Sequence, residues 1–119
     1  MAGESLHEER SVLTPETVDR HRAISTLMEE LEAIDWYDQR IEASSDPELV
    51  QILTHNREEE KEHASMLLEW LRRHDPGFDK QLRAQLFRAG PIRETDAPGG
   101  PEQPGETDGS LGMGSLRGR

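Results

Sequence analysis

The 119-residue sequence contains no cysteine, which excludes disulfide bonds and thiolate metal ligands. Aromatic residues make up only 4% of the chain and hydrophobic residues 32%, so few side chains are available for a core. No apolar run approaches the length of a signal-peptide core or a membrane span. We therefore expect a cytoplasmic protein that enters a compartment only if another component carries it there, and that gains stability by association.

Basic residues are also in short supply. The 14 lysines and arginines stand against 25 aspartates and glutamates, and the formal net charge is −11. This balance argues against nucleic acid or an anionic membrane as a partner. It is compatible with cation binding, although an acidic surface more often serves solubility.

Two stretches of the sequence begin with the same helix-start signal, a capping residue followed by proline. Thr14 and Pro15 open a helix that can run unbroken over residues 15–43. Residues 44–48 repeat the signal, and a second helix is expected over residues 47–74. We therefore predict an all-α fold built mainly on two long antiparallel helices.

The other segments differ in composition from the two long helices. Residues 1–13 are polar, and we expect a flexible N-terminus. A short third helix over residues 78–89, closed by Gly90, completes a helical domain at residues 14–90. Residues 91–107 are rich in proline, glycine and acidic residues without periodicity, which indicates a disordered linker. The third helix has one apolar stripe, formed by Phe78, Leu82 and Leu86.

Residues 108–119 contain a small internal repeat, Gly-Ser-Leu-Gly followed by Gly-Ser-Leu-Arg. One interpretation is more linker with a few stray leucines. The other is a docking peptide, whose glycines let the backbone lie close to a partner surface. The side chains that would fill pockets on that partner are Leu111, Met113 and Leu116.

The second helix carries a polar block in the middle of its apolar face. Because each residue turns about 100° around a helix, Asn56, Glu60 and His63 fall among apolar side chains. A carboxylate buried there is unfavourable unless a partner compensates its charge. The first helix has a similar feature, since Glu30 borders its apolar stripe.

A glutamate on one helix and Glu-x-x-His on its neighbour form half of the ligand set of ferritin-like di-iron carboxylate bundles. The i, i+3 spacing places Glu60 and His63 on one helix face. Because such bundles need four helices, a symmetric dimer would supply the missing half. Two copies of Glu30 and Glu60 bring four negative charges, which balance two Fe²⁺ ions. The oxygen-rich ligand set suits iron or manganese better than copper.

Each of these residues also has a simpler interpretation. Glu60 and His63 can form salt bridges across an ordinary helical dimer. Tyr37 is in line with Glu30, where it can be a packing residue or lie close to the metals as a weak ligand. The opposite face of the first helix carries Glu29, Glu32 and Trp36. Residues of this kind more often form a solvated helix face than a site through which metal enters.

Several runs of the sequence resemble the encapsulated ferritins. The resemblance covers nearly all of residues 18–87 and is strongest at residues 28–33, 35–40, 55–57, 59–64 and 68–73. The closing residues 108–119 are similar to the peptide by which such cargo binds inside encapsulin shells. Met113 stands there in place of the usual aliphatic residue.

This resemblance implies a ferroxidase that oxidises Fe²⁺ to Fe³⁺ with O₂ as cargo of a bacterial encapsulin nanocompartment, where the iron is stored. It implies protomers that pair face to face into a ferritin-like four-helix bundle, and dimers that assemble into an annular decamer. Glu30, Glu60 and His63 would be the di-iron ligands, with Tyr37 near the metals. Two further metal positions are implied. One is an outer site that passes on Fe²⁺, at Glu29 and Glu32 near Trp36; the other is a secondary cation site, with calcium as a candidate, at Glu59 and Glu62.

Two other functions are compatible with the sequence. One is a non-catalytic helical cargo protein that binds a divalent metal such as Fe²⁺, Mn²⁺ or Zn²⁺ without turnover. The other is a purely structural helical dimer, which the inward glutamates and histidine disfavour because leucine would make a better seam. Ligand identity does not fix redox activity, so the sequence separates oxidation from simple binding poorly.

Overall fold

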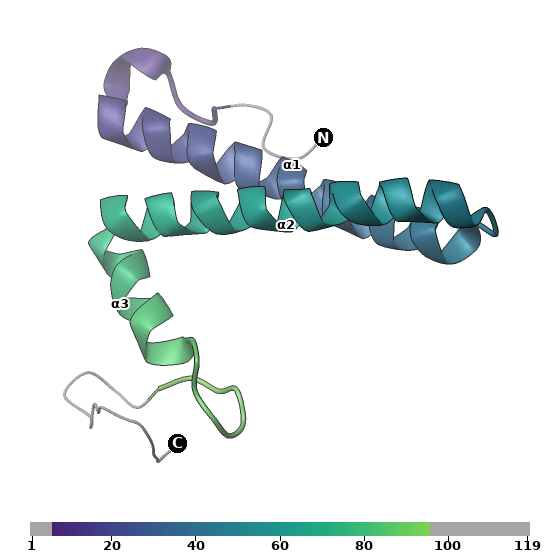
Figure 1. The fold of residues 1–119 in the computed structure, drawn as a ribbon. Coiled ribbons are helices and arrows are strands. Elements are labelled where there is room, and N and C mark those ends of the chain that lie inside the picture. The colour runs from purple at the N-terminus through teal and green to yellow at the C-terminus, as the bar shows by residue number, and fades with distance from the viewer. Residues whose placement is uncertain (1–5, 96–119) are drawn as a thin grey trace. The chain divides into compact units, whose positions relative to one another are not determined.

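The computed structural model describes residues 6–95 (Figure 1). No strand occurs in this range, and no helix in it has the length and apolar character needed to cross a membrane. The prediction of an all-α fold with two long helices and a short third one is confirmed. The helical elements are η1 (Arg10–Val12, a 3₁₀ helix), α1 (Pro15–Ala43), α2 (Pro47–His74) and α3 (Pro76–Gln85).

Both long helices begin at the capping residues that the sequence predicts. The Thr14 side chain accepts a hydrogen bond from the backbone N–H of Thr17 at 3.1 Å. Asp46 accepts from the N–H groups of Glu48 and Leu49 at 3.0 and 3.4 Å. These bonds satisfy amide donors that have no partner inside the helix. Because the connection between α1 and α2 is so short, the two helices run antiparallel, as predicted (Figure 1).

α1 and α2 pack against each other as a hairpin. The side chains that are buried in this hairpin are few and mostly small. All of them lie on the half of the hairpin that is remote from the connection between the helices. The buried hydrophobic residues within the described part of the chain are Val18, Ala23, Ala64 and Leu71.

Much apolar surface of the hairpin is exposed. Four large hydrophobic side chains of α1 and three of α2 are more than two-fifths open to solvent, and several lie at helical spacing along one stripe. A surface of this kind on a small domain marks an interaction site. The single chain therefore does not close its own core. The exposed residues are Ile24, Met28, Leu31 and Trp36 of α1, and Leu49, Ile52 and Met66 of α2.

The end of the hairpin near the connection is joined by a polar contact. Arg57 of α2 donates from Nη1 to Asp38 Oδ1 on α1 at 2.8 Å, and from Nε to Glu58 Oε2 at 3.0 Å. Lys61 donates to the same oxygen of Glu58 at 3.4 Å. The bond to Asp38 raises the pKa of Arg57, and the bond from Arg57 lowers the pKa of Glu58.

α3 belongs to a second compact unit of the chain and differs from the prediction in its bounds. It begins at Pro76, two residues before the predicted start, and ends at Gln85, four residues before the predicted end. Asp75 and Pro76 repeat the cap-and-proline signal that opens the long helices. Phe87 then takes the left-handed conformation, with φ of 61°, so the helix stops before Gly90.

The segments outside these helices are described in part. The N-terminal segment 1–13, which we expect to be flexible, contains η1, where the Val12 N–H donates to the Glu9 carbonyl at 3.1 Å. Of the predicted linker, residues 91–95 are described, and they are not helical. The predicted targeting peptide, residues 108–119, lies outside the described residues.

The last turns of α2 hold a charge cluster that can be tested directly. Arg72 forms two hydrogen bonds to the Glu69 carboxylate, at 2.9 and 2.8 Å, and Arg73 donates a third at 2.6 Å. The bonds from Arg72, followed by that from Arg73, lower the pKa of Glu69 from 4.5 to about 2.

We predict that the Glu69 carboxyl titrates near 2 in the folded protein. Because the folded pKa is lower than the unfolded one, the stability that this group contributes is present above about pH 4.5. It is lost as the pH falls from about 4.5 towards about 2. An NMR titration of the side-chain carboxyl carbon measures the value. Replacing Arg72 and Arg73 with glutamine should return it towards 4.5, and an unchanged value would contradict the assignment.

Candidate metal centre

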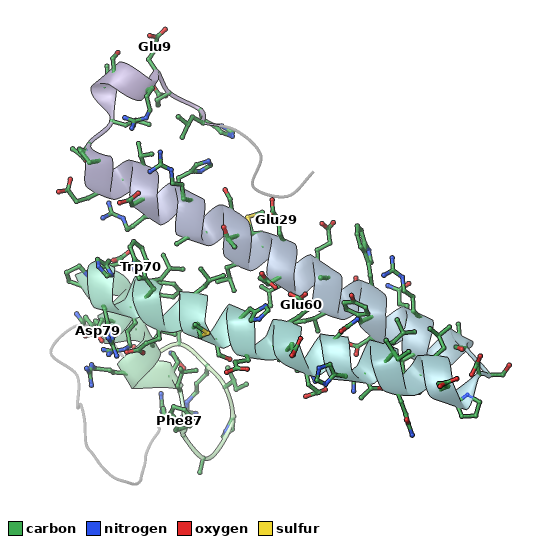
Figure 2. The ribbon with its side chains drawn as sticks, turned by 45° about the horizontal axis from the view of Figure 1, so that its top comes forward. Glu9, Glu29, Glu60, Trp70, Asp79 and Phe87 are labelled. Carbon is green, nitrogen blue, oxygen red and sulfur yellow. The ribbon has the colours of Figure 1, made fainter. Side chains whose placement is uncertain are left out.

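Three of the predicted ligands converge between the two long helices. Glu30 comes from α1, and Glu60 and His63 come from successive turns of α2. One ligand atom of each side chain lies within 4.8 Å of the others. Figure 2 shows Glu60 where α2 faces α1, and Glu29 on the side of α1 turned away from α2. The antiparallel hairpin thus brings together side chains that are thirty residues apart in the sequence.

The separations in this group are too long for hydrogen bonds. His63 Nδ1 lies 3.7 Å from Glu30 Oε1 and 3.7 Å from Glu60 Oε1. Two ligands of one octahedral ion, each about 2.1 Å from it, lie about 3 Å apart. The two separations that involve His63 are slightly wider than this, and all three atoms lie within 4.8 Å of one another, so side-chain rotations would let them contact one ion.

The Oε1 atom of Glu30 is buried and has no hydrogen-bond partner. The Glu30 and Glu60 side chains are only 21% and 25% exposed. In the part of the chain that the structure describes, the ion pairs of both carboxylates are with His63, which is charged only when protonated. A desolvated carboxylate oxygen without a donor is unfavourable. These residues therefore fit a cation, and two carboxylates with one imidazole suit iron, manganese or zinc.

One side of this ligand group is open. The His63 side chain is 50% exposed, whereas the two carboxylates are mostly covered. Met66 follows His63 by three residues and Ile52 precedes it by eleven, so all three project to the same side of α2. Ile52 and Met66 are 54% and 64% exposed. The single chain thus offers three ligands, and next to them lies an uncovered apolar surface.

The other predicted site residues do not join this group. Tyr37 is half-buried on α1, where the Arg40 guanidinium lies 5.7 Å from the centre of its ring. The same guanidinium lies 5.9 Å from the ring of Trp36, which is 48% exposed. Glu29 is exposed and Glu32 is half-buried. The predicted outer site thus combines Glu29 and Glu32 with Trp36. Among the described residues, these side chains do not form a converging group of ligands.

The predicted secondary cation positions are also on the surface. Glu59 and Glu62 are exposed on α2. Glu59 Oε2 lies 3.2 Å from His55 Nε2, a contact between residues one turn apart. The sequence interpretation assigned no role to His55, although its i, i+4 spacing to Glu59 was available as a signal.

Arg57 is a further residue that the spacing of ligands does not reveal. It bridges to α1 through Asp38, one helical turn away from Glu60. This contact can be predicted from the register of the two helices. In an antiparallel hairpin where residue 30 faces residue 63, residue 38 lies close to residue 57.

Comparisons with known proteins give a consistent result. The EncFtn-like family model matches residues 5–89. The encapsulated ferritin-like protein of Rhodospirillum rubrum is 57% identical, over 96% of this chain and 89% of its own length. A ferritin-like protein of Thermotoga maritima is 48% identical, over 92% of this chain and 96% of its own length.

A solved structure agrees with these matches. The crystal structure of a protein from Nitrosomonas europaea superposes with a TM-score of 0.73 at 56% sequence identity. The match covers 76% of this chain and all of the other one. With the family model spanning most of the sequence and relatives this similar, the chain belongs to the EncFtn-like family of encapsulated ferritin-like proteins.

Proposed function

We propose that the protein is a ferroxidase that binds pairs of Fe²⁺ ions and oxidises them with O₂. The observation that carries this proposal is the converging group of Glu30, Glu60 and His63, in which the buried Oε1 of Glu30 has no hydrogen-bond partner. Membership of a ferritin-like family supports iron as the metal.

The ligand chemistry is suited to iron as substrate. Carboxylates and imidazole bind both Fe²⁺ and Fe³⁺, and negative ligand charge favours the more highly charged product ion. Each Fe²⁺ gives up one electron, so a pair held together can deliver two electrons to O₂. The side chains themselves contribute position, charge and restricted access; the redox chemistry belongs to the metal.

The second half of the site is proposed to come from a second copy of the chain. His63 is half-exposed, and three ligands leave room for more around a metal ion. The adjoining exposed residues, Ile52 and Met66, would be covered by a partner that presents the same face. Such a pair forms a four-helix bundle with two copies of each ligand. By resemblance to the encapsulated ferritins, the dimers would assemble further into an annular decamer.

The remaining predicted residues are proposed to admit metal to the di-iron site, to border that site or to bind further cations. Glu29 and Glu32 lie near the exposed Trp36 on the outer face of α1 and would attract Fe²⁺ and pass it on. Tyr37 would border the di-iron site once two chains pair. Glu59 and Glu62 would hold secondary cations, with calcium as a candidate.

The cellular setting is proposed to be the lumen of an encapsulin shell in the bacterial cytoplasm. The sequence of residues 108–119 resembles a shell-binding peptide, with Leu111, Met113 and Leu116 as the side chains that would dock. The relative from Rhodospirillum rubrum is named an encapsulated ferritin-like protein, which supports this setting. Iron oxidised by the protein would then be stored inside the shell.

We predict that Glu60→Ala abolishes O₂-dependent oxidation of Fe²⁺. Fe²⁺ is added to the purified protein without oxygen, air is admitted, and near-ultraviolet absorbance is followed together with the mass of the assembly. The wild-type protein should show a rapid rise with two irons per dimer, and Glu48→Ala, an exposed change on the same helix, should behave alike. An active Glu60→Ala variant would refute the site. Iron that binds without an absorbance change would indicate a metal-binding cargo protein instead.

We also predict that Glu30→Leu stabilises the metal-free protein. The change removes a buried carboxylate oxygen that has no partner, so the free energy of unfolding should rise by about 1–3 kcal/mol. Metal binding should be lost at the same time. Chemical denaturation of metal-free protein measures the first effect. Glu29→Leu is the matched control because its side chain is exposed on the neighbouring position, and an equal gain there would argue against the explanation.

Deleting residues 108–119 should leave iron oxidation intact and prevent co-purification with a co-expressed encapsulin shell. The reason is that these residues lie beyond the helical domain and carry the docking side chains. Replacing Leu111 and Leu116 with serine in the full-length chain should have the same effect. Encapsulation that survives both changes would rule out this role for the tail.

A further inference from the structure

The hairpin is held differently on the two sides of the candidate metal centre. The four buried hydrophobic residues lie on the side remote from the connection between α1 and α2. On the other side, residues 31–59 include no buried side chain, and half-buried apolar residues such as Ile34, Ile41 and Leu53 form the seam. Apolar contacts of this kind are not directional, so they resist separation of two helices better than they resist sliding.

A directional contact is present on that same side. The Arg57 guanidinium donates to Asp38 of α1 at 2.8 Å, and this is the hydrogen bond that joins the two helices among residues 31–59. Its Nε–H donates at 3.0 Å to Glu58, which also accepts from Lys61 at 3.4 Å. The Arg57 side chain is only 23% exposed. A planar guanidinium held by two carboxylates has little freedom to move.

The Arg57–Asp38 contact lies close enough to the ligand group along both helices to affect its geometry. Arg57 precedes Glu60 by three residues, so it lies about 4.5 Å further along the axis of α2 on a neighbouring part of the same face. Asp38 follows Glu30 by eight residues, which is about 12 Å along α1. A slide of α1 past α2 would therefore stretch the Arg57–Asp38 bond and displace Glu30 from Glu60 and His63 by the same amount.

We propose that Arg57 is a positioning residue: by holding Asp38, it fixes the register at which Glu30 meets Glu60 and His63. The inference rests on the proposed metal-binding function and adds a residue that contacts no metal. Glu58 and Lys61 support Arg57 from its own helix, so Arg57 is fixed on α2 before it reaches across to α1. A ligand group defined within a few tenths of an ångström needs such support, because the ligands themselves repel one another when no metal is bound.

The test compares Asp38→Ala with Asp19→Ala in the full-length chain, using Co²⁺ as a spectroscopic probe. Asp19 is a matched control: its side chain is also 55% exposed and also accepts a 2.8 Å bond from an arginine, Arg22, but within α1. We expect Asp38→Ala to bind Co²⁺ about tenfold more weakly and to change the visible absorption bands of the bound ion. Asp19→Ala should match the wild type in both respects.

Further measurements separate positioning from loss of the fold. Circular dichroism and the mass of the assembly should be the same for both variants without metal. Asp38→Glu, which keeps the charge, should recover part of the Co²⁺ affinity. Equal Co²⁺ binding and equal spectra for wild type and Asp38→Ala would overturn the inference, and so would an equal loss in the Asp19→Ala control. Wild-type protein that takes up no Co²⁺ and no Fe²⁺ would refute the proposed function itself, and the inference with it.

Discussion

Two carboxylates held between packed helices without a fixed positive charge are the constraint on which the structure depends. Glu30 and Glu60 lie mostly covered by the hairpin, and the Oε1 atom of Glu30 has no donor. Their repulsion opposes the packing of α1 on α2, and His63 can offset it only when protonated. A chain with this feature fits a cation that would neutralise the carboxylates, and in the proposed function further ligands would complete the coordination.

The proposed completion of the site by a second copy also accounts for the distribution of apolar residues. A monomer that folded for itself would turn Ile52 and Met66 inward, yet both are more than half-exposed on the side of α2 that carries His63. The apolar surface and the unfinished site therefore face the same side. One partner of the same sequence would cover both, so burial of surface and completion of the site are expected to occur in a single step.

The sequence predicted that Glu30, Glu60 and His63 lie together, because two rules were sufficient. Helical periodicity placed Glu30, Glu60 and His63 on inner faces, and two cap-and-proline signals with a short connection forced the helices to be antiparallel. Tyr37 shows where this reasoning stops: periodicity assigns a residue to a face, but the distance to the ligands depends on how the helices cross. Glu30, Glu60 and His63 are expected to act together, while a role for Tyr37 at the site depends on the proposed dimer.

The start of α3 was mispredicted for a different reason. Asp75 and Pro76 lie between the predicted second and third helices, yet this pair ends α2 and also begins α3, since proline fits the first turn of a helix as well as it ends the preceding one. Arg57 and Asp38 were missed because charged residues on a helix are usually solvated. Their pairing follows from register, which can be deduced only after a facing pair such as residues 30 and 63 has been accepted.

The location of the buried residues has a consequence for how the hairpin closes. Val18 lies near the start of α1 and Leu71 near the end of α2, so packing of the two helices at this end of the hairpin closes a long loop rather than a short one. The entropy lost on closing a loop grows only with the logarithm of its length, and each doubling adds about 0.6 kcal/mol. Burying hydrophobic residues at the end of the hairpin remote from the connection therefore adds little to the entropic penalty of folding. The part of the hairpin between these buried residues and the connection is then available for charged side chains, which a tightly packed core would not tolerate.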